Sequence, residues 1–280
     1  MRPWLHLARV SNLPTVWTNV TAAWLLAGGT FTEPRLYWLI LAGSLLYTGG
    51  MILNDAADVN FDREHRKDRP IPSGQVGLNA AWIACILMLL GGATLATWFG
   101  ANPRITALLV ASIVFYDLYH KQWAGSVIIM GACRMLLYLM AASAAPAAAL
   151  PAAVALGCYV VGITIAARLE HKNGVLPATS SMLALALLYT PGIVFAMRFA
   201  SAGGYPMQLV ILAAFAILIA YATQMLRKGG PAIGQAVGTL LAGIAIVDAL
   251  AVSTVSTTIA LGFVALAPLL RFWQRWVAAT

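Results

Sequence analysis

Three aspartates with helical spacing stand immediately after an apolar run in the first quarter of the chain. Asp55, Asp58 and Asp62 occupy positions i, i+3 and i+7, so on a continuous helix their side chains lie within about 60° of one another. Like charges stacked in this way repel, and a purely structural helix would avoid them. A divalent cation reverses that penalty, and Mg²⁺ usually takes one or two carboxylates together with substrate phosphates. The spacing therefore predicts a Mg²⁺ site at these aspartates that receives a phosphorylated substrate.

The residues on either side of the aspartates support this interpretation. Asn54 and Asp55 directly follow the apolar run 47–53, so the carboxylates begin at a membrane boundary, where charges are costly and usually functional. Basic residues follow, among them Lys67 and Arg69, and cations of this kind suit diphosphate oxygens. The alternative is a solvated loop in which the acids and bases pair only with one another.

The elements that hold these residues are predicted to be membrane-spanning helices. Apolar residues make up 61% of the 280 residues and charged residues 9%, whereas soluble domains have about 45–50% and about 25%. A backbone in lipid must satisfy its own hydrogen bonds, so the apolar spans are expected to be helical. We predict one all-α membrane domain over residues 1–280, a bundle of nine or ten transmembrane helices. The candidate spans are 13–29, 36–53, 78–99, 103–118, 123–145, 149–167, 178–199, 206–226, 236–251 and 255–270.

Positive charge is distributed unevenly between the two sides of this expected bundle. The formal net charge is +8, which by itself would suit a nucleic-acid partner. If the N-terminus is cytoplasmic, however, most Lys and Arg residues fall in cytoplasmic loops and termini, and the opposite face holds only Arg35, Arg104 and Arg198. This is the positive-inside pattern of membrane proteins. It predicts a cytoplasmic N-terminus and a cytoplasmic aspartate cluster, with membrane lipids as surroundings and no nucleic-acid partner.

Two adjacent runs resemble the first signature of the UbiA family of intramembrane prenyltransferases: Asn54-Asp55-Ala56-Ala57-Asp58-Val59-Asn60-Phe61-Asp62 and Lys67-Asp68-Arg69-Pro70-Ile71-Pro72-Ser73-Gly74. Length, hydropathy and loop order extend the resemblance over essentially the whole chain. It implies a UbiA-like bundle in a bacterial inner membrane, where Mg²⁺ helps to bind a prenyl diphosphate and the prenyl group passes to an unidentified acceptor. No obligate protein partner is expected. In this framework Asp55 and Asp58 are catalytic, and Asn54, Lys67 and Arg69 bind the diphosphate.

A tyrosine and a lysine after the fourth predicted span match a second feature of the family. They are Tyr116 and Lys121, in the run Tyr116-Asp117-Leu118-Tyr119-His120-Lys121. By resemblance, Lys121 contacts the diphosphate and Tyr116 faces the allylic carbon. An aromatic face stabilises a cation by about 0.5–2 kcal/mol, more when water is excluded. The alternative is an interfacial aromatic belt with a snorkelling lysine.

The second acidic signature of the family, Asp-x-x-x-Asp, is degenerate in this chain. Alignment on Gly174 puts Ala166 at the first Asp position and Glu170 at the second, so Glu170 is the one metal ligand expected from this loop. Arg168 and Lys172 flank it and are predicted to share the diphosphate charge. The departure leaves open whether one or two Mg²⁺ ions bind, and whether the acceptor is aromatic or another small molecule. It also keeps open a terpene cyclase, in which the prenyl cation is trapped within the same molecule.

Ionisable residues inside or beside the spans provide candidates for an acceptor site. Arg134 lies deep in its predicted span, where an arginine normally faces a partner or a polar cavity. It either binds a carboxylate on the acceptor or pairs structurally with Asp248 in a late span. By resemblance, Arg9 and Asn12 line the acceptor side of the cavity; topology and helix capping are the alternative.

A third hypothesis, from another functional class, is a transporter or a non-catalytic lipid-binding protein. Arg134 and Asp248 would then mark a substrate path. Transporter sites usually lie near the membrane midplane on broken helices, whereas the acids of this chain concentrate at one face. Prenyl transfer is therefore the favoured prediction.

Overall fold

The computed structural model describes residues 2–171, 178–202, 204, 206–274 and 276, and within them the chain is helical with no strand. The elements follow in the order α1 (Arg2–Leu7), η1 (Val10–Asn12), α2 (Leu13–Leu26), α3 (Pro34–Ala57), α4 (Val59–His65), α5 (Leu78–Trp98), α6 (Pro103–Tyr119), α7 (Ser126–Ala141), α8 (Pro146–His171), α9 (Ala178–Ala202), α10 (Pro206–Lys228), α11 (Pro231–Ala242), α12 (Ile244–Val252) and α13 (Thr257–Trp273).

Apolar helices lie at the positions where spans were predicted, which confirms the all-helical membrane class. Six of them in the described chain are long and apolar enough to cross a membrane: α3, α5, α8, α9, α10 and the α11–α12 pair, which together cover Pro231–Val252. Helices α7 and α13 are apolar but shorter. The number of spans, nine or ten, stays a prediction.

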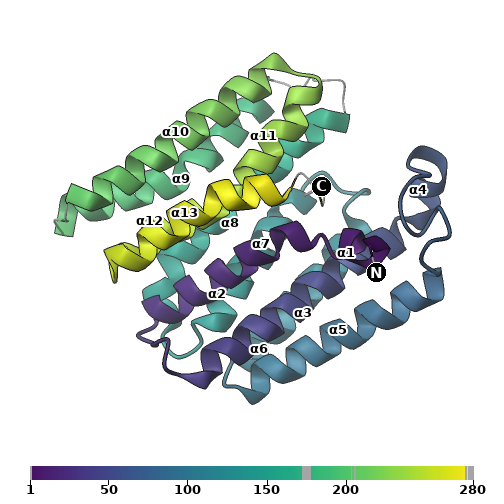
Figure 1. Cartoon of the computed structure of the whole chain (residues 1–280), viewed down its shortest axis with the longest axis horizontal. Helices are drawn as coiled ribbons and strands as arrows, with labels where there is room; N and C mark the ends of the chain where they lie inside the picture. Colours follow the sequence, from purple (N-terminus) through teal and green to yellow (C-terminus); the bar gives the residue numbers. More distant parts are fainter. Residues whose placement is uncertain (1, 172–177, 203, 205, 275, 277–280) are drawn as a thin grey trace.

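Small residues let the helices approach closely. Helix α8 packs between α7 and α9, and α3 packs along α5 (Figure 1). A Cβ atom added to Gly131 of α7 would lie 2.6 Å from the carbonyl oxygen of Gly157 in α8, closer than real Cβ atoms come. Backbone contact of this kind is typical of helices in lipid, where small residues at the interface allow close van der Waals packing.

The outer surface of the bundle is apolar, as a lipid-facing surface must be. Helix α5 lies at one edge of the bundle and α10 at the opposite edge (Figure 1). On α5, Ile83, Leu87 and Leu90 are 60%, 64% and 62% exposed, and their spacing places them on one side of the helix. An apolar stripe this exposed is unsuited to water and marks a surface covered by lipid or another chain.

The helix that carries the aspartates does not continue through them. Helix α3 ends at Ala57, Asp58 has φ −84° and ψ 2°, and α4 begins at Val59. The prediction of one continuous helix through the three aspartates was therefore wrong. Asp55 and Asp62 both contact Arg69, whereas Asp58 contacts Lys121 and His120. Figure 1 shows α4 leaving the bundle at the end where α1 also lies.

Candidate active site

Asp55 and Asp62 meet at a single guanidinium nitrogen, although a helix break separates them. Nη1 of Arg69 donates to Asp55 Oδ1 at 3.1 Å and to Asp62 Oδ2 at 2.9 Å. Both carboxylates are buried, with Asp55 6% and Asp62 1% exposed. Charge-assisted hydrogen bonds of this length are the strong ones in proteins. The end of α3, helix α4 and the loop that follows are therefore tied together by charge.

Arg9 adds a second cation to this cluster. Its Nη2 donates to Asp55 Oδ1 at 3.2 Å, and its Nη1 contacts Met51 Sδ at 3.5 Å. Its backbone has φ 44° and ψ 50°, a left-handed conformation that is strained for a residue with a side chain. Arg9 was predicted to line the acceptor side of the cavity, and the structure places it against Asp55. Its neighbour Asn12 is buried at the end of η1.

Asp58 faces a separate basic pair from the end of α6. Lys121 Nζ lies 2.8 Å from Asp58 Oδ1, and His120 Nε2 lies 3.5 Å from Oδ2. Lys121 also lies 3.8 Å above the centre of the Phe61 ring, and the ring of Tyr116 stacks on His120 with centroids 5.0 Å apart. The predicted residues Asp58, Tyr116 and Lys121 are thus brought together.

Asp117 is a site residue that the sequence prediction missed. It lies in the last turn of α6, is 4% exposed, and accepts a hydrogen bond of 3.0 Å from Asn54 Nδ2. The available signal was a carboxylate within an apolar helix, beside Tyr116. Within the described residues the site therefore holds Asp117 in addition to the predicted Asp55, Asp58 and Asp62.

The residues of the degenerate second signature lie differently from the expectation. Arg168 donates to the carbonyl oxygen of Ala124 at 2.6 Å and to Ser126 Oγ at 2.8 Å, so its guanidinium binds the connection between α6 and α7. Ala166 is fully buried. Two further predicted residues remain to be placed. The side chain of Glu170, at the end of α8, and the whole of Lys172 lie outside the described part of the chain.

The two remaining predicted cations, Lys67 and Arg134, lie in different surroundings. Lys67 is exposed in the loop after α4. Arg134 lies among the helices and donates to Asn19 Oδ1 at 2.8 Å and to Thr15 Oγ1 at 3.3 Å. Asn19 in turn donates to Asp248 Oδ2 at 2.7 Å. Arg134 and Asp248 are therefore linked through Asn19, and no direct ion pair joins them.

The carboxylates have the donor chemistry that Mg²⁺ requires, but cations of the protein stand among them. Within the described residues no three Asp, Glu, His or Cys side chains lie close enough to hold a metal ion by themselves. The oxygens of Asp55 and Asp62 nevertheless reach one nitrogen of Arg69, so a cation already bridges them. Mg²⁺ usually needs only one or two carboxylates, because substrate phosphates and waters complete its shell. The residues fit such a metal–diphosphate pair.

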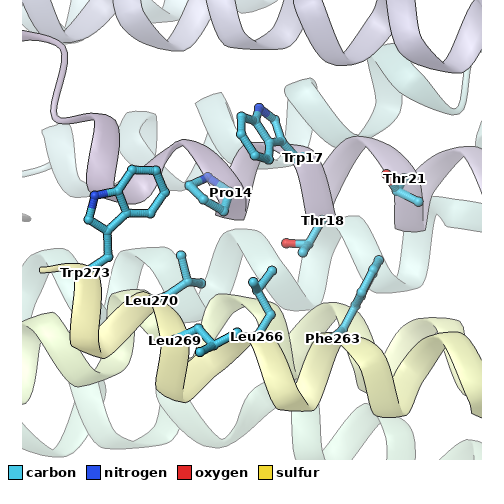
Figure 2. Close-up of a pocket in the computed structure, with 9 residues that line it drawn as sticks. All are labelled: Pro14, Trp17, Thr18, Thr21, Phe263, Leu266, Leu269, Leu270 and Trp273. Carbon is cyan, nitrogen blue, oxygen red and sulfur yellow. The ribbon is translucent and has the colours of Figure 1, made fainter. Parts of the chain in front are cut away.

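An apolar pocket of about 330 Å³ lies away from the carboxylates, between α2 and α13. Figure 2 shows Thr18 of α2 pointing toward Leu266 of α13, with Trp273 at one end of the lining and Phe263 at the other. None of the aspartates lines it. Its lining suits a hydrocarbon group and not a charged one.

Fold and site together define a class: a polytopic helical membrane protein with an acidic and basic cluster at one end of its bundle. A model of the family described as the UbiA prenyltransferase family matches residues 15–187, more than half of the chain. The chain belongs to that family.

Relatives in this family are named as prenyltransferases of several substrates. A stretch of 93 residues is 33% identical to the digeranylgeranylglyceryl phosphate synthase of Methanoculleus marisnigri and covers 33% of each chain. A stretch of 109 residues is 32% identical to the 4-hydroxybenzoate octaprenyltransferase of Polynucleobacter asymbioticus, covering 37% of this chain and 38% of that one. The chain thus matches between about a third and a half of the length of these curated relatives.

Solved structures support the same fold over more of the chain. A UbiA homologue from Aeropyrum pernix K1 superposes with a TM-score of 0.70 at 19% identity, covering 87% of this chain and 98% of that one. A UbiA homologue from Archaeoglobus fulgidus, bound to GPP and Mg²⁺, gives a TM-score of 0.60 at 14% identity, covering 96% and 99%. At these identities the likeness concerns the fold.

Proposed function

We propose that this protein is a Mg²⁺-dependent prenyltransferase that moves a prenyl group from a prenyl diphosphate to a small-molecule acceptor within the membrane. The observation that carries the proposal is the convergence of Asp55 and Asp62 on one Arg69 nitrogen, with Asp58 held by Lys121 close by. Carboxylates that could bind Mg²⁺ and cations that could bind diphosphate oxygens therefore lie side by side there. Family membership and the homologue bound to GPP and Mg²⁺ support it.

The proposed roles follow from the ion pairs. When bound, Mg²⁺ would neutralise charge that develops on the diphosphate as it leaves. Asp55 and Asp62, whose oxygens meet at one nitrogen of Arg69, would hold it, with Asp58 and Glu170 as further candidates. Arg69 and Lys121, with Arg9, would exchange their carboxylate partners for diphosphate oxygens; Asn54, Lys67, Arg168 and Lys172 are further candidates for diphosphate binding.

Bond changes at the allylic carbon complete the reaction. The bond from that carbon to the diphosphate oxygen breaks, and the diphosphate leaves with the electron pair. An electron-rich atom of the acceptor then bonds to the carbon and releases a proton. Tyr116, which stacks on His120, would stabilise positive charge with its ring face. The apolar helices would keep water from the cation.

The acceptor and the prenyl chain call for different surroundings. Arg134 donates to two neutral side chains, Asn19 and Thr15, and a guanidinium has five N–H groups, so we assign it to a polar or anionic group of the acceptor. Asn12, buried near this network, is assigned to the same side. The apolar pocket between α2 and α13 is proposed to take hydrocarbon of a substrate.

The surroundings of the protein are part of the proposal. Its apolar helices and family membership make it an integral membrane protein. The distribution of Lys and Arg supports a cytoplasmic N-terminus and aspartate cluster, in a bacterial inner membrane. The chain is proposed to act as one domain over residues 1–280, without a nucleic-acid or obligate protein partner.

The test measures diphosphate release from geranylgeranyl and farnesyl diphosphate by the purified protein, with and without Mg²⁺. Asp55→Ala should abolish Mg²⁺-dependent release while the protein keeps its wild-type unfolding temperature in detergent within a few degrees. Glu64→Ala is the matched control, because Glu64 is an exposed acid of α4 whose contact is a 4.0 Å approach to His65. Full activity in a folded Asp55→Ala protein would sink the proposal.

The second candidate function is a terpene cyclase of the same fold. The altered second signature favours it, because buried Ala166 replaces an acid and Arg168 is engaged by Ala124 and Ser126. Incubation with a prenyl diphosphate in the absence of any acceptor separates the two functions. Diphosphate released together with a cyclic hydrocarbon or alcohol identifies a cyclase. No consumption of prenyl diphosphate under any condition would instead favour a transporter or lipid-binding protein.

A further inference from the structure

Asp117 is a buried carboxylate that the proposed mechanism does not use. Asp55, Asp58 and Asp62 each lie within 4.0 Å of a basic group, whereas Asp117 makes no ion pair within the described residues. A carboxylate that is 4% exposed is costly without a compensating partner. Such a group is retained where it has a task.

The partner of Asp117 is an amide that belongs to the proposed ligand-binding set. Asn54 Nδ2 donates to Asp117 Oδ1 at 3.0 Å. Asp117 Oδ1 accepts this hydrogen bond, and only the NH₂ end of an amide can donate one. The carbonyl oxygen of Asn54 must then point away from Asp117. Asn54 is half-buried, and this oxygen makes no hydrogen bond to another described residue.

Close packing of α3 on α6 fixes the distance between these two side chains. Gly50 lies one turn before Asn54 on α3. A Cβ atom there would lie 3.0 Å from Ile113 Cγ2 and 3.9 Å from Asp117 Oδ2. Helix α6 therefore approaches α3 at the glycine, and Asp117 reaches the same face of α3 from which Asn54 projects.

We propose that Asp117 is a positioning residue that locks the Asn54 amide in one orientation and so presents its carbonyl oxygen, a hard oxygen donor, to the ligand of the aspartate cluster. The inference rests on the proposed function, because that ligand is taken to be a prenyl diphosphate with Mg²⁺. Groups that orient a metal-binding residue in this way commonly change metal affinity about 10–100-fold when they are removed.

The test compares three variants of the full chain: Asp117→Asn, Asn54→Asp, and the double exchange Asn54→Asp/Asp117→Asn. The exchange keeps the total charge and the hydrogen bond, with donor and acceptor reversed. The readout is equilibrium binding of geranylgeranyl thiolodiphosphate, an unreactive analogue, by calorimetry over a range of Mg²⁺ concentrations. Thermal unfolding is measured in parallel. Asp68→Asn, an exposed acid in the same segment, is the control.

In Asp117→Asn the amide of Asn54 can turn over, so the Mg²⁺ concentration for half-maximal analogue binding should rise at least about 10-fold. The exchange variant places a carboxylate beside the ligand and should recover to within about threefold of wild type. Asp68→Asn should match wild type.

Three results overturn the inference. An unchanged Mg²⁺ dependence in Asp117→Asn removes the positioning role. Loss of folding in both Asp117→Asn and the exchange shows that Asp117 is structural. An exchange variant that folds but binds no better than Asp117→Asn shows that the orientation of the amide is irrelevant. The failure of the proposed function is distinguishable, because then the wild-type protein itself shows no Mg²⁺-dependent binding of the analogue.

Discussion

The two regions that resemble the family's acidic signatures differ in what their charged side chains contact. Around the first, Asp55, Asp58 and Asp62 remain and are held by basic side chains that a substrate could displace. Around the second, Ala166 is buried where an acid was expected, and Arg168 binds the protein itself. The carboxylates of the first region pair with cations that a ligand could replace. The guanidinium of Arg168, in the second region, is bound by the backbone and side chain of the protein.

The second region nevertheless supports the first through a chain of hydrogen bonds. Arg168 donates to Ser126 Oγ at 2.8 Å, and Ser126 Oγ donates to the carbonyl oxygen of His120 at 3.0 Å. Lys121, the next residue, pairs with Asp58 at 2.8 Å. Arg168 therefore acts on the site through the loop it holds. The two regions therefore differ in role: the first holds the paired carboxylates, and a cation of the second supports the loop that carries Lys121.

The largest expected effect comes from the first region. Asp58→Ala removes the carboxylate held by Lys121 and His120, and we expect kcat/KM for the prenyl diphosphate to fall about 10²–10³-fold, the loss typical of one preorganised electrostatic group. Steady-state assays of diphosphate release measure this. A fall of less than fivefold in a folded variant would contradict the difference drawn between the two regions.

Introducing an acid at position 166, in the second region, should destabilise the protein and should not raise its activity. Ala166 is fully buried. Ala166→Asp therefore buries a carboxylate, with an expected loss of several kcal/mol of stability. Thermal unfolding in detergent gives the loss, and Ala166→Ser is the smaller polar control. A stable Ala166→Asp protein with raised activity would mean that this position still faces the diphosphate.

A smaller effect is expected from the supporting arginine. Arg168→Ala frees the connection between α6 and α7 and should lower kcat/KM about 10-fold, as loss of a supporting contact outside the site commonly does. Ser126→Ala should lower it in the same direction, because it breaks the same chain of hydrogen bonds. If Arg168 instead binds diphosphate directly, as the sequence predicted, Ser126→Ala will be silent and Arg168→Ala will match Asp58→Ala.

The smallest expected effect is the difference in stability between two substitutions of Arg9. Both Arg9→Gly and Arg9→Ala remove the pair with Asp55, but only glycine accepts φ 44° without strain. Arg9→Gly should therefore be more stable than Arg9→Ala by about 1 kcal/mol, and both should lose activity. Equal unfolding temperatures would show that the backbone relaxes at this position.

Much of the fold was predictable because lipid imposes a simple rule on sequence. Long apolar runs identified the helices, and the aspartates at the end of one run predicted the candidate site. The break at Asp58 was not predictable from spacing, since three acids at i, i+3 and i+7 fit a helix equally well. The partners of Arg168 and Asp117 depend on contacts between α6, α8 and α3, which a single sequence does not encode locally.

The Arg69 nitrogen between Asp55 and Asp62 has a consequence for the order in which ligands bind. Asp55 pairs with Arg9 and Arg69, and Asp62 pairs with Arg69, so these acids and bases offset one another. Mg²⁺ alone would have to displace a guanidinium, and a diphosphate alone would strip the carboxylates of their counter-ions. When Mg²⁺ and diphosphate bind together, Mg²⁺ takes the released carboxylates and the diphosphate takes the released guanidinium groups. Under the proposed function, metal and diphosphate should therefore increase each other's affinity by the same factor, as reciprocal linkage demands.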